Sequence, residues 1–124
     1  MAENSSNTAS GSHRSGVKRL IIMRHAEADW GLNDFDRPLT KRGHEQAAAA
    51  GAWLAARGYI PEQIMSSSAL RTRQTTTWVS DGLGAKAPTA HLDEGLYEVS
   101  ASRIIARINS VSENVHSLMV VSHL

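Results

Sequence analysis

The sequence predicts a single α/β domain whose mostly parallel sheet is flanked by helices. Short apolar runs typical of buried strands alternate along the chain with stretches of helical periodicity. Two of these runs, far apart in the sequence, are each followed by a histidine. Ligands of open α/β sheets bind where the parallel strands end, so we expect both histidines to lie at one functional edge.

The chain begins with a polar segment that leads into a candidate strand. Residues 1–16 are rich in Ser, Asn and Gly, and they carry too little apolar surface to offset the entropy of ordering, so we expect a disordered tail. Residues 17–23 (VKRLIIM) are nearly continuously apolar from Leu20, which is typical of a strand covered on both faces. The strand leads directly to Arg24 and His25, two side chains that are rarely buried.

A helix is predicted over residues 41–58. Thr40 is a good N-cap for it, and Gly58 is a typical residue to end it. Small and apolar residues recur at the spacing of one helix face: Ala47, Ala50, Gly51 and Leu54. The alanines indicate close packing of this helix against a sheet.

The second half of the chain supplies two further strands and two further helices. Residues 62–68 predict a short strand that runs into a turn, and residues 69–84 predict a helix whose periodicity is weakened by a run of three consecutive threonines. Residues 102–115 show a stronger helical pattern. Its apolar face comprises Ile104, Ile105, Ile108, Val111 and Val115. Residues 116–124 again have the pattern of a buried strand, and they contain His123.

Composition narrows the classes of function. The 124 residues suit one domain, and the net charge of +1 gives no whole-surface attraction to nucleic acid or to an anionic membrane. The absence of cysteine excludes disulfides, thiolate nucleophiles and cysteine metal sites. No run approaches the ~20 apolar residues that span a bilayer. The N-terminus also lacks the order of a secretory signal, so we expect a cytoplasmic protein.

The candidate site consists of Arg24, His25, Arg37, Arg71 and His123. Three guanidinium groups and two imidazoles in one pocket repel each other unless an anion binds, and the oxygens of a phosphoryl group accept forked hydrogen bonds from arginine. A neutral imidazole can attack phosphorus and give a phosphohistidine intermediate that water resolves. Because the arginines would supply the electrostatic stabilisation, we expect no metal and no cofactor.

Each of these residues also has a structural interpretation. Arg24 and His25 could form a solvated strand end, because charged residues are common at the ends of elements. Arg37 could be an exposed residue of a turn, and Arg71 could be ordinary charge on a helix surface. His123 stands next to the last residue, where fraying is common.

Four segments, taken in order, resemble the histidine phosphatase superfamily. LIIMRHAEA (residues 20–28) is similar to its RHG or RHA signature, and DFDRPLTKRGHEQA (residues 34–47) resembles the RPLTxxGxxQA element of its SixA-like branch. SSSALRTRQT (residues 66–75) and MVVSH (residues 119–123) resemble its SSPALRARQT and VVGH segments. The resemblance covers the chain from Val17 onward and implies a three-layer, phosphoglycerate mutase-like sandwich that lacks C-terminal elements.

The resemblance implies a role for each residue of the candidate site. His25 would be the nucleophile that becomes phosphorylated. Arg24, Arg37 and Arg71 would clamp the phosphoryl oxygens. His123 would complete the pocket and donate a hydrogen bond to an oxygen in the transition state.

The resemblance also bears on the general acid and on the extent of the domain. Many relatives supply a glutamate from an LxE segment, and LDEGLYE offers Glu94, with Glu98 as the alternative or with no such acid at all. Ser68 replaces the usual proline, and Ser122 replaces the common glycine. The superfamily continues past the second histidine, so we expect residues 17–124 to be a C-terminally incomplete histidine phosphatase-like domain.

The resulting expectation is a metal-independent phosphatase that acts through a phosphohistidine intermediate, most like the SixA type. Its partner would be a protein that carries phosphohistidine or a small phosphorylated substrate, with neither nucleic acid nor membrane involved. Two alternatives stay open: a non-catalytic module that binds phosphoryl groups, and a small-molecule phosphomonoesterase. The physiological substrate and the oligomeric state do not follow from the sequence.

Overall fold

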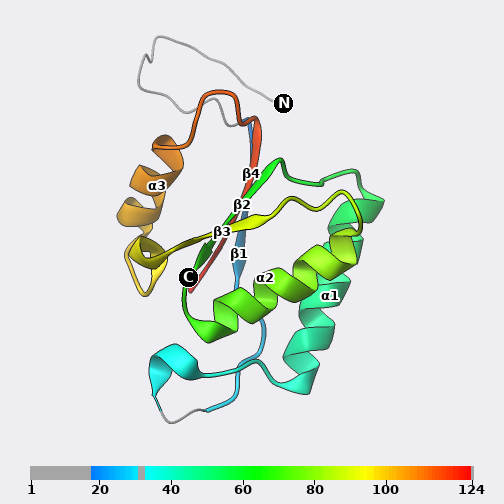
Figure 1. Cartoon of the computed structure of the whole chain (residues 1–124), viewed down its shortest axis with the longest axis vertical. Coiled ribbons are helices and arrows are strands. Elements are labelled where there is room, and N and C mark those ends of the chain that lie inside the picture. The colour runs from blue at the N-terminus through cyan, green and yellow to red at the C-terminus, as the bar shows by residue number, and fades with distance from the viewer. Residues whose placement is uncertain (1–17, 31–32, 124) are drawn as a thin grey trace.

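The structure is a computed structural model that describes residues 18–30 and 33–123 (Figure 1). The tail expected over residues 1–16 lies outside the described residues. Strands and helices alternate along the described chain, and the sheet separates one helix from the other two. This arrangement confirms the predicted α/β class with flanking helices.

The sheet contains four strands, and every strand pair is parallel. They are β1 (Arg19–Arg24), β2 (Gln63–Ser67), β3 (Ala90–Asp93) and β4 (Ser117–Ser122), in the spatial order β1-β4-β2-β3. Strand β4 is therefore central although it comes last in the chain. In the β1–β4 ladder Arg24 lies opposite Ser122, so the next residue of each strand emerges at the same edge.

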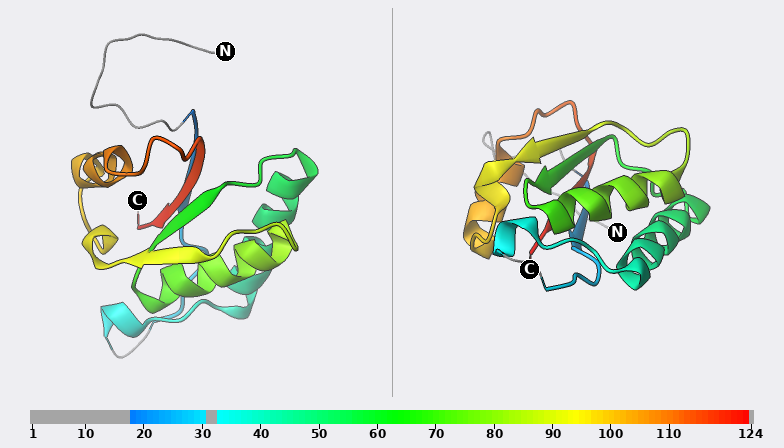
Figure 2. Two further views of the ribbon diagram at one scale, coloured as in Figure 1. Left: turned by 45° about the horizontal axis from the view of Figure 1, so that its top comes forward. Right: turned by 60° about the horizontal axis from the view of Figure 1, so that its bottom comes forward.

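Two helices cover one face of the sheet and a third covers the other. Helices α1 (Lys41–Ala56) and α2 (Leu70–Leu83) lie together, and α3 (Ala101–Asn109) lies on the opposite side (Figure 2). Two short 3-10 helices, η2 (Asp34–Asp36) and η3 (Glu94–Leu96), belong to the connections. Three layers result, as the resemblance implied.

Each face of the sheet has its own core. The core beneath α1 and α2 comprises Ala47, Leu54, Ile64, Val79, Leu83, Met119 and Val121. The core beneath α3 comprises Met65, Leu96, Ile104, Ile108, Leu118 and Val120. Side chains of β2 and β4 alternate between these two cores, so both central strands are covered on both faces.

Helix α1 begins and ends where the sequence predicts. The Thr40 hydroxyl accepts a hydrogen bond from the Gly43 amide at 2.9 Å, and Gly58 follows the helix with φ of +73°. The expectation that its small residues pack against a sheet is incomplete, because the closest approach is to α2. A Cβ added to Gly51 would overlap the Val79 carbonyl, and one added to Gly82 would overlap the Ala48 carbonyl.

The apolar periodicity of α2 is weak because threonines occupy part of its buried face. Thr72, Thr75 and Thr76 are buried, and the hydroxyls of Thr75 and Thr76 donate to the carbonyls of Arg71 and Thr72 at 2.8 and 2.9 Å. These bonds satisfy polar groups that would otherwise be costly to bury. A polar helix face can therefore pack against the sheet.

The strand predicted over residues 17–23 is β1, but it is covered on one face only. Leu20 and Ile22 are 42% and 51% exposed, whereas Ile21 and Met23 pack against the core beneath α1 and α2. The prediction of two covered faces is wrong here because β1 is an edge strand and the core beneath α3 draws on β2 and β4.

The helix predicted over residues 102–115 ends at Asn109 in the structure. Ile104 and Ile108 are buried, but Ile105 is 56% exposed. Val111 and Val115 still pack against the same core from the connection that follows. The spacing of Val111 and Val115 therefore reflects their burial against this core, although neither residue belongs to the helix.

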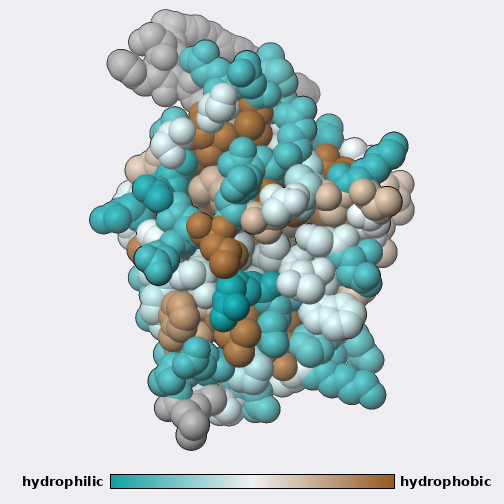
Figure 3. Space-filling view, viewed as in Figure 1, coloured by the Kyte–Doolittle hydropathy of each residue, from teal (hydrophilic) through white to brown (hydrophobic). Residues whose placement is uncertain are grey.

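None of the helices within residues 18–30 and 33–123 combines the length and apolar character needed to cross a bilayer. On the face shown in Figure 3, apolar side chains occur in small separate areas among hydrophilic ones.

Candidate active site

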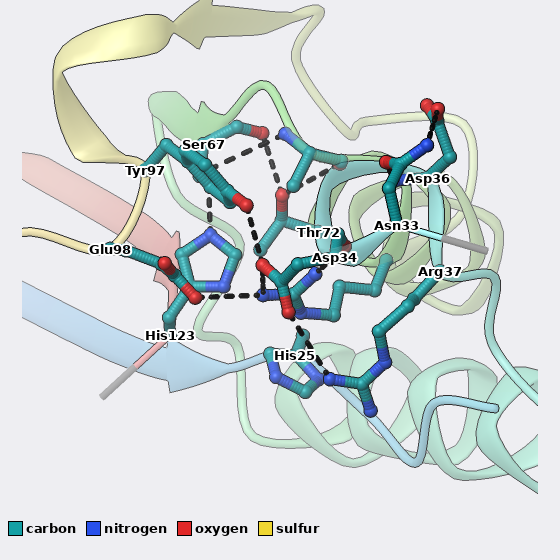
Figure 4. A network of polar contacts seen from close by, with 12 residues as sticks. His25, Asn33, Asp34, Asp36, Arg37, Ser67, Thr72, Tyr97, Glu98 and His123 are labelled. Carbon is teal, nitrogen blue, oxygen red and sulfur yellow. Dashed lines mark hydrogen bonds and ion pairs between the residues drawn. The ribbon is translucent and has the colours of Figure 1, made fainter. Parts of the chain in front are cut away.

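Two histidine rings lie side by side at the carboxyl ends of β1 and β4 (Figure 4). The ring centroids of His25 and His123 are 5.6 Å apart, and the His25 amide donates to the Ser122 carbonyl at 3.0 Å. Strands whose sequences are almost 100 residues apart thus bring their histidines together, as the sequence predicts.

The ring of His25 is held in one tautomer. Its Nδ1 lies 2.8 Å from the Ala26 carbonyl oxygen, which can only accept, so Nδ1 carries the proton and Nε2 carries the lone pair. The Ala26 amide in turn donates to the Thr75 hydroxyl at 2.9 Å. The loop that carries His25 is therefore tied to α2.

Both imidazoles are neutral at pH 7. Burial lowers the pKa of His25, the hydrogen bond to Ala26 opposes this, and the charges of Arg71, Arg24 and Arg37 lower the pKa further. Burial, followed by the charges of Arg71 and His25, lowers the pKa of His123 to about 4. Neutral His25 has the lone pair that a nucleophile needs.

Arg71 is the buried cation of the site. It belongs to the first turn of α2, and only 3% of its surface is exposed. Its Nη1 donates to the Asp34 carbonyl, and its Nη2 lies 3.0 Å from the Asp34 carboxylate and 3.6 Å from the Glu98 carboxylate. Its buried Nε has no hydrogen-bond partner among the described residues.

Asp34 stands at the centre of the polar network (Figure 4). Its carboxylate contacts Arg71, lies 3.5 Å from Arg37 and accepts a hydrogen bond from the Tyr97 hydroxyl. The hydrogen bond from Tyr97, and then that from Arg71, hold the pKa of Asp34 well below its usual range. Asp34 is therefore an anion at neutral pH.

The other two arginines lie on the more open side of the site. Arg37 is one-fifth exposed, donates from Nε to the Asp29 carbonyl at 2.9 Å and places its guanidinium 4.6 Å from the centre of the Trp30 ring. The side chain of Arg24 is exposed, but its charge still lowers the pKa of His25 and of His123. All five residues of the candidate site thus gather at one edge of the sheet.

Ser67, at the end of β2, positions the second histidine. Its hydroxyl lies 2.8 Å from Nε2 of His123, while Nδ1 of His123 is buried and has no hydrogen-bond partner within the described part of the chain. The Tyr97 ring packs edge-on against His123, with centroids 5.3 Å apart. When Ser67 donates to Nε2, Nδ1 carries a proton that can be donated to a ligand oxygen.

The two candidate acids are placed differently. Glu94 is exposed in η3 and forms no hydrogen bond or ion pair with the site residues described here. Glu98 reaches Arg71 and adopts a positive φ of 50°, which is uncommon for a residue other than glycine. The role of either glutamate stays a prediction.

Four polar residues of this site were not predicted from the sequence: Asp34, Ser67, Thr75 and Tyr97. Three of them fall within the segments that resemble the superfamily, and Tyr97 stands in the segment that supplied the candidate acids. Their position next to matched residues was the available signal. Residues 18–30 and 33–123 contain no group of three or more His, Cys, Asp or Glu side chains placed to hold a metal ion.

Comparison with known families agrees with this geometry. The sequence profile of the histidine phosphatase superfamily (branch 1) matches residues 20–123. An uncharacterized protein of Mycobacterium tuberculosis strain H37Rv is 40% identical over 103 residues, which are 82% of this chain and 62% of that protein. The chain therefore spans less than two thirds of the length of that relative.

Solved structures show the same fold. A protein assigned as the phosphohistidine phosphatase SixA of Agrobacterium tumefaciens matches with a TM-score of 0.78 and 31% identity, over 86% of this chain and 70% of that one. The protein histidine phosphatase SixA in complex with tungstate matches with a TM-score of 0.77 and 30% identity, over 85% of this chain and 69% of that one.

Proposed function

Since the chain belongs to branch 1 of the histidine phosphatase superfamily, we propose that it removes a phosphoryl group from its substrate through a phosphohistidine formed on His25. One observation carries the proposal: His25 and His123 lie 5.6 Å apart beside the buried guanidinium of Arg71. A neutral nucleophile next to fixed positive charge suits attack on a phosphoryl group.

The reaction would proceed in two displacements. In the first, the Nε2 lone pair of His25 forms a bond to phosphorus while the bond from phosphorus to the leaving group breaks, and the leaving group departs with the electron pair and takes up a proton. In the second, a water oxygen attacks phosphorus. The N–P bond then breaks, its electron pair returns to Nε2, and inorganic phosphate is released.

The cations would stabilise the charge that spreads over the phosphoryl oxygens in both transition states. Arg71 is held in place by its burial in α2, whereas Arg24 and Arg37 approach from the open side. His123 would donate from Nδ1 to a phosphoryl oxygen, because its Nε2 is already bonded to Ser67. Burial, together with the charges of the same cations, keeps the pKa of His25 low, so the nucleophile would remain neutral.

We propose a protein phosphohistidine as the substrate class. The support is the similarity to SixA proteins, whose names describe them as histidine or phosphohistidine phosphatases. A phosphoramidate leaving group is itself basic, so it depends less on a general acid than an alkoxide does. If an acid acts, Glu98 is better placed than Glu94, because Glu98 reaches Arg71.

The test is to trap the phosphoryl group on the protein. The protein is incubated with a phosphohistidine peptide, quenched without acid and mapped by mass spectrometry. We expect the phosphoryl group on His25, and we expect His25→Ala to lose both the label and turnover. His91→Ala is the matched control, because His91 is exposed on β3 and should keep both.

Two results would contradict the proposal. Turnover retained by His25→Ala would remove the role of His25 as nucleophile. Binding of phosphate or tungstate by the wild-type protein without label or turnover would instead support a non-catalytic phosphoryl-binding module.

A further inference from the structure

The strongest contact of the phosphate-binding cation is with an anion of the protein itself. Both terminal nitrogens of Arg71 are engaged by Asp34, Nη1 by its carbonyl and Nη2 by its carboxylate at 3.0 Å. The same carboxylate also lies 3.5 Å from Arg37. Asp34 thus bridges two of the three arginines that would clamp a phosphoryl group.

A phosphoryl group and Asp34 would bind to the same nitrogens of Arg71. Oxyanions bind arginine through two parallel N–H···O bonds, and the Nε of Arg71 is its only nitrogen without a hydrogen-bond partner among the described residues. A bidentate contact with Arg71 therefore includes at least one terminal nitrogen that Asp34 already engages, so the two anions would share that nitrogen. Asp34 and a phosphoryl oxygen cannot both accept from Nη2 along the same direction.

We propose that the Asp34 carboxylate is an internal competitor of the phosphoryl group for Arg71 and Arg37, and that it sets how strongly the site retains oxyanions. The proposal rests on the proposed function, because it takes this site to be one that binds phosphoryl groups. The competing ligand is a tetrahedral oxyanion, either the substrate phosphoryl group or product phosphate.

Asp34 is the partner that can move. Its side chain is 42% exposed, and it belongs to a 3-10 helix of three residues with none buried. Arg71, by contrast, is 3% exposed and belongs to a helix of 14 residues. Displacement of the carboxylate toward solvent would leave the guanidinium in place for the incoming anion.

Tyr97 holds the Asp34 carboxylate in its position beside Arg71. Its hydroxyl donates to the Asp34 carboxylate, and its ring packs edge-on against Phe35 with centroids 5.2 Å apart. The tyrosine therefore fixes both the charged group and the short helix that carries it. Removal of the hydroxyl should free the carboxylate without removing its charge.

Competition of this kind would favour product release. A carboxylate near Arg71 offers an alternative partner as soon as phosphate begins to leave, so the buried guanidinium is never left without an anion. It would also favour oxyanions with two negative charges over those with one, because the weaker anion gains less by displacing Asp34.

The test measures oxyanion binding rather than turnover. Inorganic phosphate and tungstate are titrated calorimetrically into the wild-type protein and into Asp34→Asn, Tyr97→Phe, Asp36→Asn and Arg71→Ala. We expect Asp34→Asn to bind both anions about fivefold more tightly, as for loss of a partly exposed ion pair. Tyr97→Phe should bind them about twofold more tightly, because it removes only the hydrogen bond that holds the Asp34 carboxylate and leaves its charge.

Asp36→Asn is the matched control. It removes the same charge from the same short helix, but its carboxylate accepts from Asn33 and contacts neither arginine among the described residues. We expect its affinity to stay within about twofold of wild type, because exposed charges at longer range are screened. Thermal unfolding of each variant verifies that it is folded.

The outcomes separate this inference from the proposed function. If the wild-type protein binds phosphate, Arg71→Ala loses it, and Asp34→Asn and Tyr97→Phe bind no more tightly than wild type, Asp34 is not a competitor although the site stands. If neither the wild-type protein nor any variant binds phosphate or tungstate, the phosphoryl site itself is refuted and the inference falls with it.

Discussion

The Thr75 hydroxyl accepts a hydrogen bond from the Ala26 amide at 2.9 Å and donates one to the Arg71 carbonyl at 2.8 Å. A single side chain thus joins the loop after His25 to the turn of α2 that carries the buried arginine. The relative placement of His25 and Arg71 depends on this residue as well as on the sheet.

Replacement of Thr75 by valine should reduce kcat more than it changes KM. The variant keeps the shape but leaves the Ala26 amide without its partner, at a cost of about 1–3 kcal/mol in the free energy of unfolding. Thr77→Val is the control, because Thr77 makes the same type of bond to Arg73 but is exposed. Steady-state kinetics and urea unfolding measure both effects, and equal kcat values in the two variants would contradict the prediction.

Activity should persist below pH 6.5. The folded pKa of His25 lies below 6.5, so its neutral form remains abundant as the pH falls through that value, and kcat/KM declines only at lower pH. Arg24→Gln removes an exposed positive charge and should raise the pKa of His25. NMR titration of the imidazole measures the shift, with Arg103→Gln on α3 as the control. An unchanged titration in Arg24→Gln would show that Arg24 does not act on His25.

Ser67→Ala should lower kcat by about tenfold, less than the roughly 10²–10⁴-fold contributed by a positioned acid or base itself. Without the hydroxyl, Nε2 of His123 loses its partner at 2.8 Å, and the tautomer with a proton on Nδ1 is no longer favoured. Ser67→Thr retains the hydroxyl and should restore part of the rate. A purely structural role would instead lower the melting temperature of the alanine variant and leave kcat unchanged.

The free energy of unfolding should fall in acid partly because of His123. The unfolded chain takes up a proton on this residue near pH 6.5, whereas burial lowers the folded pKa to about 4. Stability is therefore full above pH 6.5 and declines as the pH falls toward 4. Urea unfolding at pH 7, 6 and 5 measures the slope. His123→Gln should give a shallower slope, and an identical slope would assign the effect to other groups.

Gly82→Ala should destabilise the fold by about 1–3 kcal/mol, the range for overpacking. The added Cβ would overlap the Ala48 carbonyl, so α1 and α2 would have to separate. Ala52→Ser changes an exposed position of α1 and should stay within about 0.5 kcal/mol of wild type. The comparison uses denaturant unfolding, and a Gly82→Ala variant as stable as wild type would show that the two helices separate at little cost.

Local patterns predicted the elements whose signals are themselves local. Thr40 and Gly58 bound α1 because capping depends only on the adjacent backbone. The number of covered faces of β1 was not predictable, because it depends on which strand lies at the edge of the sheet. The strand β3 was missed because its alternating pattern, AHLD, is only four residues long and contains a single large apolar side chain.

The site residues were likewise predictable in part. The meeting of His25 and His123 followed from strand direction, because parallel strands deliver their next residues to one edge. The contact of Asp34 with Arg71 and Tyr97 joins a helix and two connections that no periodicity relates. Such contacts are set by the packing of loops over the sheet, and only the tertiary structure contains them.

Because β1 lies at the edge of the sheet, the backbone beside His25 is held less firmly than the backbone beside His123. The backbone of β1 is hydrogen-bonded to one neighbouring strand only, while the strand that carries His123 is held from both sides. Separation of β1 from β4 would therefore move the rings of His25 and His123 apart before the two cores unfold. Heat inactivation should accordingly precede the loss of helical circular dichroism, with amide exchange fastest along residues 19–24.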